Sequence, residues 1–221
     1  MDILEALYTT RSMRRMQDRD VPEELIPRLL DAAVRAPTGG NFQNWAFVVI
    51  RDRGMKAYLG GLFREDVVAA RRTRYRELDE AVARSERSER LDAHAAFMRS
   101  MLHLAERFES VPLFIAALIR SGENTIWPGG SIYPAVWSLQ LAARAHGIGT
   151  VPVGSLARHQ QEIFPRLGVP GDEGWVLATF VALGYPTGRW GVPPRQPVHE
   201  KTFVERWGQR PSWTVPKPLW P

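Results

Sequence analysis

The sequence predicts an α+β fold with one central sheet, formed by a single domain over residues 1–221. Short apolar runs rich in β-branched and aromatic residues recur along the chain, as is typical of strands. Segments of helical periodicity separate them, in the order helices, strand, helices, strand, helix, strand, helix, strand. The sequence contains no internal repeat and no linker, and its 44% hydrophobic content is that of an ordinary globular domain.

The N-terminal part of the chain predicts two helices. A short helix is expected over residues 3–9. A second is expected to begin at Asp20, with Pro22 in its first turn and Glu23 completing a capping box. Pro37 ends this second helix. Its apolar side chains recur at helical spacing and form one buried face, made of Leu25, Leu29, Ala32, Ala33 and Ala36.

The central part predicts two interior strands between helices. The runs at 45–50 and 112–119 are apolar on both faces, as in strands that are covered on both sides. Residues 64–107 predict one or two long charged helices. The helix expected over 131–147 is apolar nearly all round, so it is either buried on all sides or half buried by a partner subunit. Gly147 is expected to cap its C-terminus.

The C-terminal part predicts a short strand at 150–154, a helix at 158–167 and a third interior strand at 175–186. The C-terminal arm, residues 200–221, is rich in Pro and Trp and has no periodicity. Large aromatic side chains are unfavourable in water, so we expect the arm to lie on another surface. The tryptophans concerned are Trp207, Trp213 and Trp220.

Composition and charge narrow the class of protein. No apolar run reaches the length of about 18 residues that a membrane-spanning helix needs, and the N-terminus lacks the apolar core of a signal peptide. The absence of cysteine excludes disulfides and thiolate chemistry, and a cytoplasmic location fits best. The net charge of +5 raises the hypothesis of nucleic-acid binding. Residues 64–107 are almost neutral, however, with ten arginines and nine acids, so we favour a small anionic ligand.

The histidines and glycine pairs predict neither a metal site nor a nucleotide fingerprint. His94 and His103 are nine residues apart, which places them on opposite sides of a helix. His146 and His159 have no carboxylate at ligand spacing. The GxG within 147–154 follows a helix and precedes a strand, which is the reverse of a dinucleotide fingerprint.

A basic turn between the first two helices is a stronger candidate for a site. Arg11, Ser12, Arg14 and Arg15 lie close together there, and arginine and serine make good phosphate ligands. The alternative is a solvated basic turn. Arg195, on a proline-rich segment, adds a further arginine, although taken alone it is better read as a surface residue.

The glycine loop, which we define as residues 37–44, is the second candidate. Gly39 and Gly40 would let backbone amides approach a flat or anionic ligand closely. The side-chain amides that follow carry donors and acceptors suited to a heterocyclic ring. Together, the basic turn and the glycine loop suggest a phosphorylated heterocycle as the ligand.

Four stretches occur in the order seen in the nitroreductase-like flavoprotein family, which the chain resembles from residue 3 to about residue 200. They are TTRSMRR, APTGGNFQNWAFVV, SIYPAVWSLQLAARAHGIGTVPVG and LGYPTGRWGVPPRQPVHE. The resemblance implies a three-layer sandwich, with a central, mostly antiparallel sheet flanked by helices. It also implies an intertwined homodimer that binds FMN at the interface, with both chains in contact with each flavin. The C-terminal arm would embrace the partner subunit, as C-terminal extensions do in this family.

The resemblance implies roles for individual residues. Arg11, Ser12 and Arg195 would hold the FMN phosphate. Arg14 would lie near the pyrimidine edge of the flavin, where a cation stabilises the reduced ring. The glycine loop would contact the ring from the other subunit, and backbone groups after the 150–154 strand would pass beside it. The residues expected to bind the cofactor are Arg11, Ser12, Arg14, Arg15, Pro37, Thr38, Gly39, Asn41, Val153, Gly154 and Arg195.

The activity implied is that of an FMN-dependent NAD(P)H oxidoreductase. NAD(P)H would reduce FMN by hydride transfer to N5, leave, and be replaced by a nitroaromatic, a quinone or another conjugated electrophile, in ping-pong order. No side-chain nucleophile and no metal is needed, because the chemistry is that of the cofactor. Two alternatives stay open. One is the same fold with another flavin chemistry, such as reductive dehalogenation or flavin fragmentation, and the other is a non-enzymatic module that binds nucleic acid.

The chain departs from the family pattern at several positions. Thr10 stands where many members have a basic residue, Thr38 replaces a serine, and Asn44 replaces the proline that follows the glutamine. The lid over the flavin, expected within 64–110, is the least family-like region and would select the acceptor. The polar residues that some relatives use after the first strand have no match here. Three arginines are candidates for their place, namely Arg71, Arg72 and Arg74.

Overall fold

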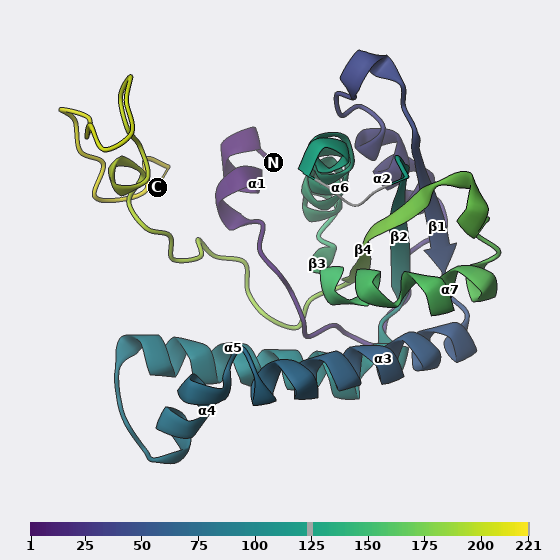
Figure 1. Ribbon diagram of the computed structural model, residues 1–221, viewed down its shortest axis with the longest axis horizontal. Helices are drawn as coiled ribbons and strands as arrows, with labels where there is room; N and C mark the ends of the chain where they lie inside the picture. The colour runs from purple at the N-terminus through teal and green to yellow at the C-terminus, as the bar shows by residue number, and fades with distance from the viewer. Residues whose placement is uncertain (123–125, 221) are drawn as a thin grey trace.

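Helices cover both faces of one antiparallel sheet in the computed structural model, which describes residues 1–122 and 126–220 (Figure 1). Each pair of neighbouring strands is antiparallel. This confirms the expected α+β class, with an antiparallel central sheet between helical layers. In spatial order the strands are β1 (Trp45–Ile50), β2 (Leu113–Arg120), β4 (Trp175–Gly184) and β3 (Gly149–Val153).

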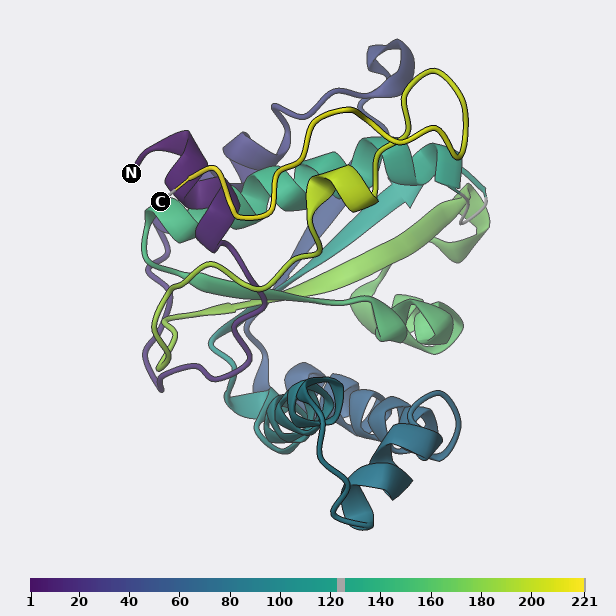
Figure 2. The same ribbon diagram turned by 90° about the vertical axis from the view of Figure 1, so that its left-hand side faces the viewer.

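Two groups of helices form the outer layers (Figure 2). Buried side chains on one face pack against α3, α5 and α7, and those on the other face pack against α2 and α6. The short helix α1 contacts α6, and α4 contacts α3 and α5. The helices are α1 (Ile3–Thr9), α2 (Leu25–Ala33), α3 (Arg53–Arg72), α4 (Arg76–Ala83), α5 (Glu89–Glu106), α6 (Ile126–Ala145) and α7 (Gln160–Leu167).

The interior strand β2 shows how the sheet divides the core. Its side chains alternate between the two faces, as the pleat requires. Phe114 and Leu118 point to the layer of α3 and α5, whereas Ile115 and Ile119 point to the layer of α2 and α6. All four are almost fully buried. The predictions of interior strands at 112–119 and 175–186 are therefore confirmed, although β4 already ends at Gly184.

The prediction that residues 45–50 form an interior strand is wrong in one respect. The run does form β1, but among the described residues β1 pairs only with β2, and it lies at the edge of the sheet. Ile50 is buried, Val49 is exposed, and the four residues before Val49 are partly buried. An apolar composition on both faces shows that a strand avoids water, but it does not show whether a second strand pairs with it.

The second helix begins later than predicted. α2 starts at Leu25, not at Asp20, and no side chain caps its N-terminus. The N–H groups of Leu25 and Ile26 instead donate to the carbonyls of Pro22 and Glu23, which form a turn before the helix. α2 ends at Ala33, before Pro37. Of the predicted face, Leu29 and Ala33 are buried, and the other members are partly exposed.

The charged region after β1 forms three helices, not one or two. α3 begins at Arg53, earlier than expected, because the Asp52 carboxylate accepts a hydrogen bond from the Met55 N–H at 2.6 Å. α5 begins after Ser88, whose hydroxyl accepts from the Leu91 N–H at 3.2 Å. α7 also starts two residues later than expected, because residues 154–159 form a 3₁₀ helix.

The long helix α6 leaves part of its apolar surface uncovered. It begins at Ile126, before the predicted start, and its first residues are nearly fully exposed, with Ile126 at 95% and Trp127 at 88%. Tyr133 and Trp137 are also exposed. The chain itself therefore does not bury α6 on all sides. Gly147 follows the helix with a φ of +71°, which confirms it as the C-terminal cap.

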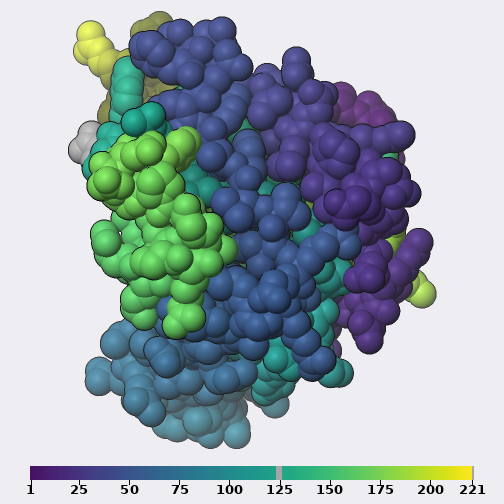
Figure 3. Space-filling view, turned by 90° about the vertical axis from the view of Figure 1, so that its right-hand side faces the viewer, coloured from purple at the N-terminus to yellow at the C-terminus, as the bar shows by residue number. Residues whose placement is uncertain are grey.

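The face seen in Figure 3 is formed largely by α3, α7 and the segment leading into β1. The Arg166 guanidinium of α7 lies 4.0 Å from the centre of the Tyr58 ring of α3, which ties the two helices together. On the opposite side, the C-terminal arm crosses α6 as irregular chain and returns to α1 (Figure 2). There the Trp220 and Tyr8 rings are 5.9 Å apart. No helix of the described residues is both long and apolar enough to cross a bilayer.

Candidate functional site

Residues 11–17, which hold the predicted basic turn, are fixed against the edge of the sheet. Ser12 forms a bridge with Thr150 of β3, and the Met13 N–H donates to the Thr150 carbonyl at 2.9 Å. Gly149 makes this approach possible, since a Cβ there would lie 2.8 Å from the Met13 Cβ. The basic side chains therefore project from backbone held by β3, not from a free turn.

Three of the predicted phosphate ligands meet in one cavity. The Arg11 cavity, as we call it, has a volume of about 710 Å³ and is lined by Arg11, Ser12 and Arg195. Arg195 reaches it from the proline-rich segment after β4. The structure thus brings together side chains that are more than 180 positions apart in the sequence. Arg14 and Arg15 line the same cavity.

Arg14 has an unusual environment for a cation. One Nη lies 3.5 Å from the Ser100 hydroxyl, and the guanidinium carbon lies 5.3 Å from the centre of the Phe97 ring. Its Nε is buried and has no hydrogen-bond partner among the described residues. Burial lowers the pKa of Arg14, and the nearby Tyr75 opposes this effect only in part. A buried donor of this kind favours an anionic or carbonyl-bearing ligand.

One wall of the Arg11 cavity comes from α5. The sequence did not identify the individual residues of this wall. Ala96, Phe97 and Ser100 line this wall. Phe97 is held edge-on by the Tyr75 ring at 5.7 Å. Alanine, phenylalanine and serine on a charged helix carry no pattern that signals a binding site. Only the expectation of a lid within 64–110 pointed to this region.

The three arginines that were candidates for reaching the flavin do not line the Arg11 cavity. Arg71 instead donates to the Asp79 carboxylate at 2.7 Å and holds α4 against α3. Arg74 lies over the Tyr75 ring at 5.6 Å, and Arg72 lines a separate hollow beside α4.

The glycine loop has a constrained backbone. Gly40, Asn41 and Gln43 all have φ between +49° and +56°, in the left-handed region. Asparagine tolerates this region better than most residues do. The Thr38 hydroxyl accepts from the Gln43 N–H at 3.2 Å and closes the loop. The loop thereby presents Phe42, which is 80% exposed, to solvent.

The glycine loop is anchored far from the Arg11 cavity of its own chain. The Gly39 N–H donates to the Ser131 hydroxyl of α6 at 3.4 Å, and the Asn44 amide donates to the Arg120 carbonyl at the end of β2 at 2.6 Å. Figures 1 and 2 show the loop at the top of the molecule and residues 11–16 well below it, between α1 and the layer of α3 and α5. Pro37, Thr38, Gly39 and Asn41 therefore do not share a site with Arg11 within one chain.

Val153 and Gly154 lie where β3 ends. The Val153 side chain is buried in the core, and Gly154 is exposed. A Cβ at Gly154 would meet its nearest atom, the Thr179 hydroxyl, at 3.9 Å, so its own chain leaves room there. The adjacent Ser155 hydroxyl is buried without a partner among the described residues.

Two histidines have carboxylate partners. His159 Nε2 lies 3.1 Å from an Asp66 oxygen, and its Nδ1 lies 3.6 Å from Glu162. The expectation that His159 has no carboxylate at ligand spacing is therefore wrong, because Glu162 lies only three residues further on, and Asp66 adds a partner from a distant helix. His94 pairs with Asp79 at 2.8 Å. Within residues 1–122 and 126–220, no cluster of three such side chains is arranged to hold a metal ion.

Comparison with known proteins assigns the chain to a family. The sequence profile described as the Nitroreductase family matches residues 7–185. The chain belongs to the nitroreductase family. The match covers the basic turn, the glycine loop and all four strands, and it ends before Arg195 and the C-terminal arm.

Relatives of this nitroreductase-family chain carry several names. An NADH dehydrogenase of Thermus thermophilus is 27% identical over 197 residues, which is 84% of this chain and 87% of that protein. A 5,6-dimethylbenzimidazole synthase of Rhodospirillum rubrum is 27% identical over 203 residues, covering 87% and 86%. Among solved structures, a Desulfovibrio desulfuricans protein described as a nitroreductase in complex with FMN has a TM-score of 0.66. It is 20% identical, with 94% of this chain and 99% of that chain covered, and confirms the fold.

Proposed function

We propose that the protein is an FMN-dependent oxidoreductase that takes electrons from NAD(P)H and passes them to a nitroaromatic, a quinone or a similar conjugated electrophile. The observation that carries the proposal is the convergence of Arg11, Ser12 and Arg195 with the half-buried Arg14 on one cavity of a nitroreductase-family fold. FMN, when bound, supplies the hydride chemistry.

The donors around the cavity fit FMN. Two guanidinium groups and a hydroxyl suit a phosphate that carries nearly two negative charges. The Arg14 Nε, buried and without a partner among the described residues, suits a ring edge on which negative charge develops. The cavity volume of about 710 Å³ lies within the range of about 300–1,000 Å³ that is usual for ligand pockets.

The residues of this chain would act by binding, orienting and excluding water. Arg11, Ser12 and Arg195 would fix the phosphate end, and Arg14 would stabilise negative charge on the ring. Phe97 and Ser100 of α5 would limit the space in the cavity that is left for the acceptor and so help to select it. No side chain is assigned a nucleophilic role.

A homodimer would complete the site. The glycine loop cannot reach the Arg11 cavity of its own chain, and we propose that its residues contact the flavin bound mainly by the partner. The exposed Ile126 and Trp127 of α6 supply apolar surface for such an interface.

FMN binding is the first test. The purified protein should show a flavin absorbance spectrum or acquire one with added FMN. Arg11→Gln and Arg195→Gln should each weaken FMN binding roughly tenfold or more, since each removes a charge-assisted contact to phosphate. Arg189→Gln is the matched control, because Arg189 is exposed on the same C-terminal segment and does not line the cavity. A colourless protein that binds no FMN would refute the proposal.

Stopped-flow mixing with NADH and NADPH separates the main proposal from its alternative. Rapid bleaching of the flavin by either nucleotide supports the oxidoreductase. The similarity to a 5,6-dimethylbenzimidazole synthase favours, as second candidate, another flavin chemistry on the same fold. A yellow protein that neither nucleotide reduces would support this second candidate.

A further inference from the structure

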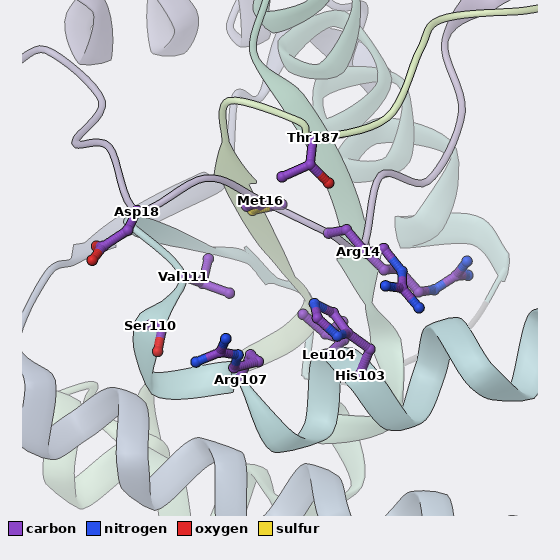
Figure 4. Close-up of a pocket in the computed structure, with 10 residues that line it drawn as sticks. Arg14, Met16, Asp18, His103, Leu104, Arg107, Ser110, Val111 and Thr187 are labelled. Carbon is purple, nitrogen blue, oxygen red and sulfur yellow. The ribbon is translucent and has the colours of Figure 1, made fainter.

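A second cavity lies on the other side of the segment that carries Arg14 and Arg15. The His103 cavity, as we call it, has a volume of about 420 Å³. Its walls include Arg15, His103 and Arg107. Figure 4 shows His103 and Arg107 on the C-terminal part of α5, facing the strand-like segment that carries Met16. The two cavities share Arg14 and Arg15 but no other residue.

The His103 cavity has an excess of positive charge that the protein does not neutralise. His103 and Arg107 are four positions apart, so they project from neighbouring turns of one helix. Neither Arg15 nor Arg107 forms an ion pair in the described parts of the chain. The one acidic side chain in the lining is Asp18, which is exposed.

The groups around His103 disfavour its charged form. Burial lowers the pKa of His103, and the nearby Arg15 and Arg107 lower it further, while Glu106 acts in the opposite sense. Cations held together in this way repel one another. An anion placed among them would relieve the repulsion and accept hydrogen bonds from two guanidinium groups at once.

Polar groups at the rim of the cavity fit the same kind of ligand. Ser110 and Thr187, both exposed, contribute hydroxyl groups to the lining, and the buried Leu104 and Val111 form an apolar floor. The hydroxyl and guanidinium donors around this floor could contact several oxygens of one anion.

We propose that the His103 cavity is a binding site for a compact dianion of the phosphate type, either inorganic phosphate or a small phosphate monoester. Arg15 and Arg107 would contact the anion from two chain segments, with the hydroxyls of Ser110 and Thr187 as further donors. The site is distinct from the one proposed for FMN. Neither Arg11, Ser12 nor Arg195 lines it, and neither His103 nor Arg107 lines the Arg11 cavity.

The proposal is tested by calorimetric titration of the full-length protein, saturated with FMN, with inorganic phosphate. Wild-type protein should bind phosphate at one saturable site per chain. Arg107→Gln should weaken that binding roughly tenfold or more. Arg90→Gln is the matched control, because Arg90 is an exposed arginine of the same helix that does not line the cavity. It should leave the affinity unchanged.

Further titrations separate this site from the proposed FMN site and distinguish inorganic phosphate from a phosphate monoester as the ligand. Arg11→Gln should leave phosphate binding intact even where it weakens FMN binding, so the two proposals can fail independently. Glycerol phosphate that binds more tightly than inorganic phosphate would indicate a monoester as the ligand, and the reverse order would indicate the free ion. If wild-type protein shows no saturable binding, or Arg107→Gln binds phosphate as wild type does, the proposal is overturned.

The pH dependence provides an independent check. Sulfate keeps its double negative charge over the range in which histidine titrates, so a change in its affinity reports the protein. Its binding should tighten as pH falls and His103 becomes charged next to Arg15, Arg107 and Arg14, with Asp18 and Glu106 the opposing charges nearby. His103→Gln should flatten this dependence. A dependence unchanged in His103→Gln would contradict the placement of the anion beside this side chain.

Discussion

At the scale of single residues, Arg14 stands out because its surroundings satisfy it only in part. A guanidinium in a protein interior usually meets a carboxylate, which offsets the loss of hydration. Arg14 has a hydroxyl at 3.5 Å and an aromatic ring instead. Such an arrangement is unfavourable for folding alone, and it becomes favourable when a ligand supplies the missing acceptor.

Because of this imbalance, we expect replacement of Arg14 to have opposite effects on the FMN-free and the FMN-bound protein. Arg14→Met should leave the Tm of the FMN-free protein unchanged or raise it, because it removes a half-buried charge that the protein compensates poorly. In the FMN-bound protein it should slow flavin reduction roughly a hundredfold and make the reduction potential more negative, because the charge on the ring loses its donor. Arg14→Lys, which keeps the charge, should show a smaller loss. A large drop in Tm without a change in potential would mean that Arg14 has only a structural role.

The backbone of the glycine loop supports a second prediction about a single residue. Asn41 has a φ of +55°, which a β-branched side chain strongly disfavours. Asn41→Val should therefore destabilise the protein by roughly 1–2 kcal/mol. Asn41→Gly is the control, because glycine adopts this conformation freely and should change stability much less. Urea denaturation compares the two, and equal losses would show that the backbone conformation is not the cause.

At the scale of elements, the small helix α4 depends on one carboxylate. Asp79 accepts from Arg71 of α3 at 2.7 Å and lies 2.8 Å from His94 of α5, so it joins the three helices of the charged region. Burial alone would raise the pKa of Asp79, but the hydrogen bonds with Arg71 and His94 outweigh it, and the pKa lies below its ordinary value of 3.8. Its side chain is only 19% exposed, so solvent screens these contacts weakly.

The lowered pKa gives the sign of a pH effect. Because the folded-state pKa is depressed, the stabilisation from Asp79 is present above its ordinary pKa and is lost as pH falls through the folded value. Asp79→Asn should destabilise the protein by roughly 1–3 kcal/mol near neutral pH, and the difference from wild type should shrink in acid. Asp92→Asn is the matched control. It removes an ion pair of α5 whose aspartate is 63% exposed, and should change stability by less than about 0.5 kcal/mol. Chemical denaturation at several pH values tests both variants.

The sequence could predict the position or the start of some helices and strands but not of others. β2 and β4 were predictable because continuous apolar runs of that length are typical of strands covered on both faces. The edge position of β1 was not, since pairing with a second strand depends on the whole topology. The starts of α3 and α5 could have been read from Asp52 and Ser88, which are favourable caps, but the sparse apolar periodicity of this region obscured them.

At the scale of the whole molecule, the structure brings the three predicted phosphate ligands to one cavity, but the other residues around that cavity were not foreseen. Arg11, Ser12 and Arg195 line one cavity, as the resemblance to flavoproteins implied. The contributions of Phe97 and Ser100 depend on how α5 crosses the sheet, which no local pattern encodes. Their roles in binding stay predictions until ligand binding is measured.

The C-terminal arm is also a feature of the whole molecule, and its truncation is our fourth prediction. Removing the residues after Trp207 should weaken the proposed homodimer roughly tenfold or more, because it deletes apolar surface that we expect to lie on the partner. Sedimentation velocity measures this. The deletion also removes the contact of Trp220 with Tyr8 of the same chain. Trp220→Leu, which removes that contact but keeps the rest of the arm, is therefore measured beside it. An unchanged sedimentation profile of the truncated protein would refute the role of the arm.

The separation between the glycine loop and the Arg11 cavity predicts how two different variants behave when they form a mixed dimer. If each flavin site takes its basic turn from one chain and its loop from the other, Arg11→Gln and Asn41→Gly damage different halves of a site. In a mixed dimer one site collects both defects and the other collects neither. Two variants that bind FMN poorly alone should thus complement each other when unfolded together and refolded, with roughly a quarter of the sites restored to full affinity. Sites built within one chain would show no such rescue.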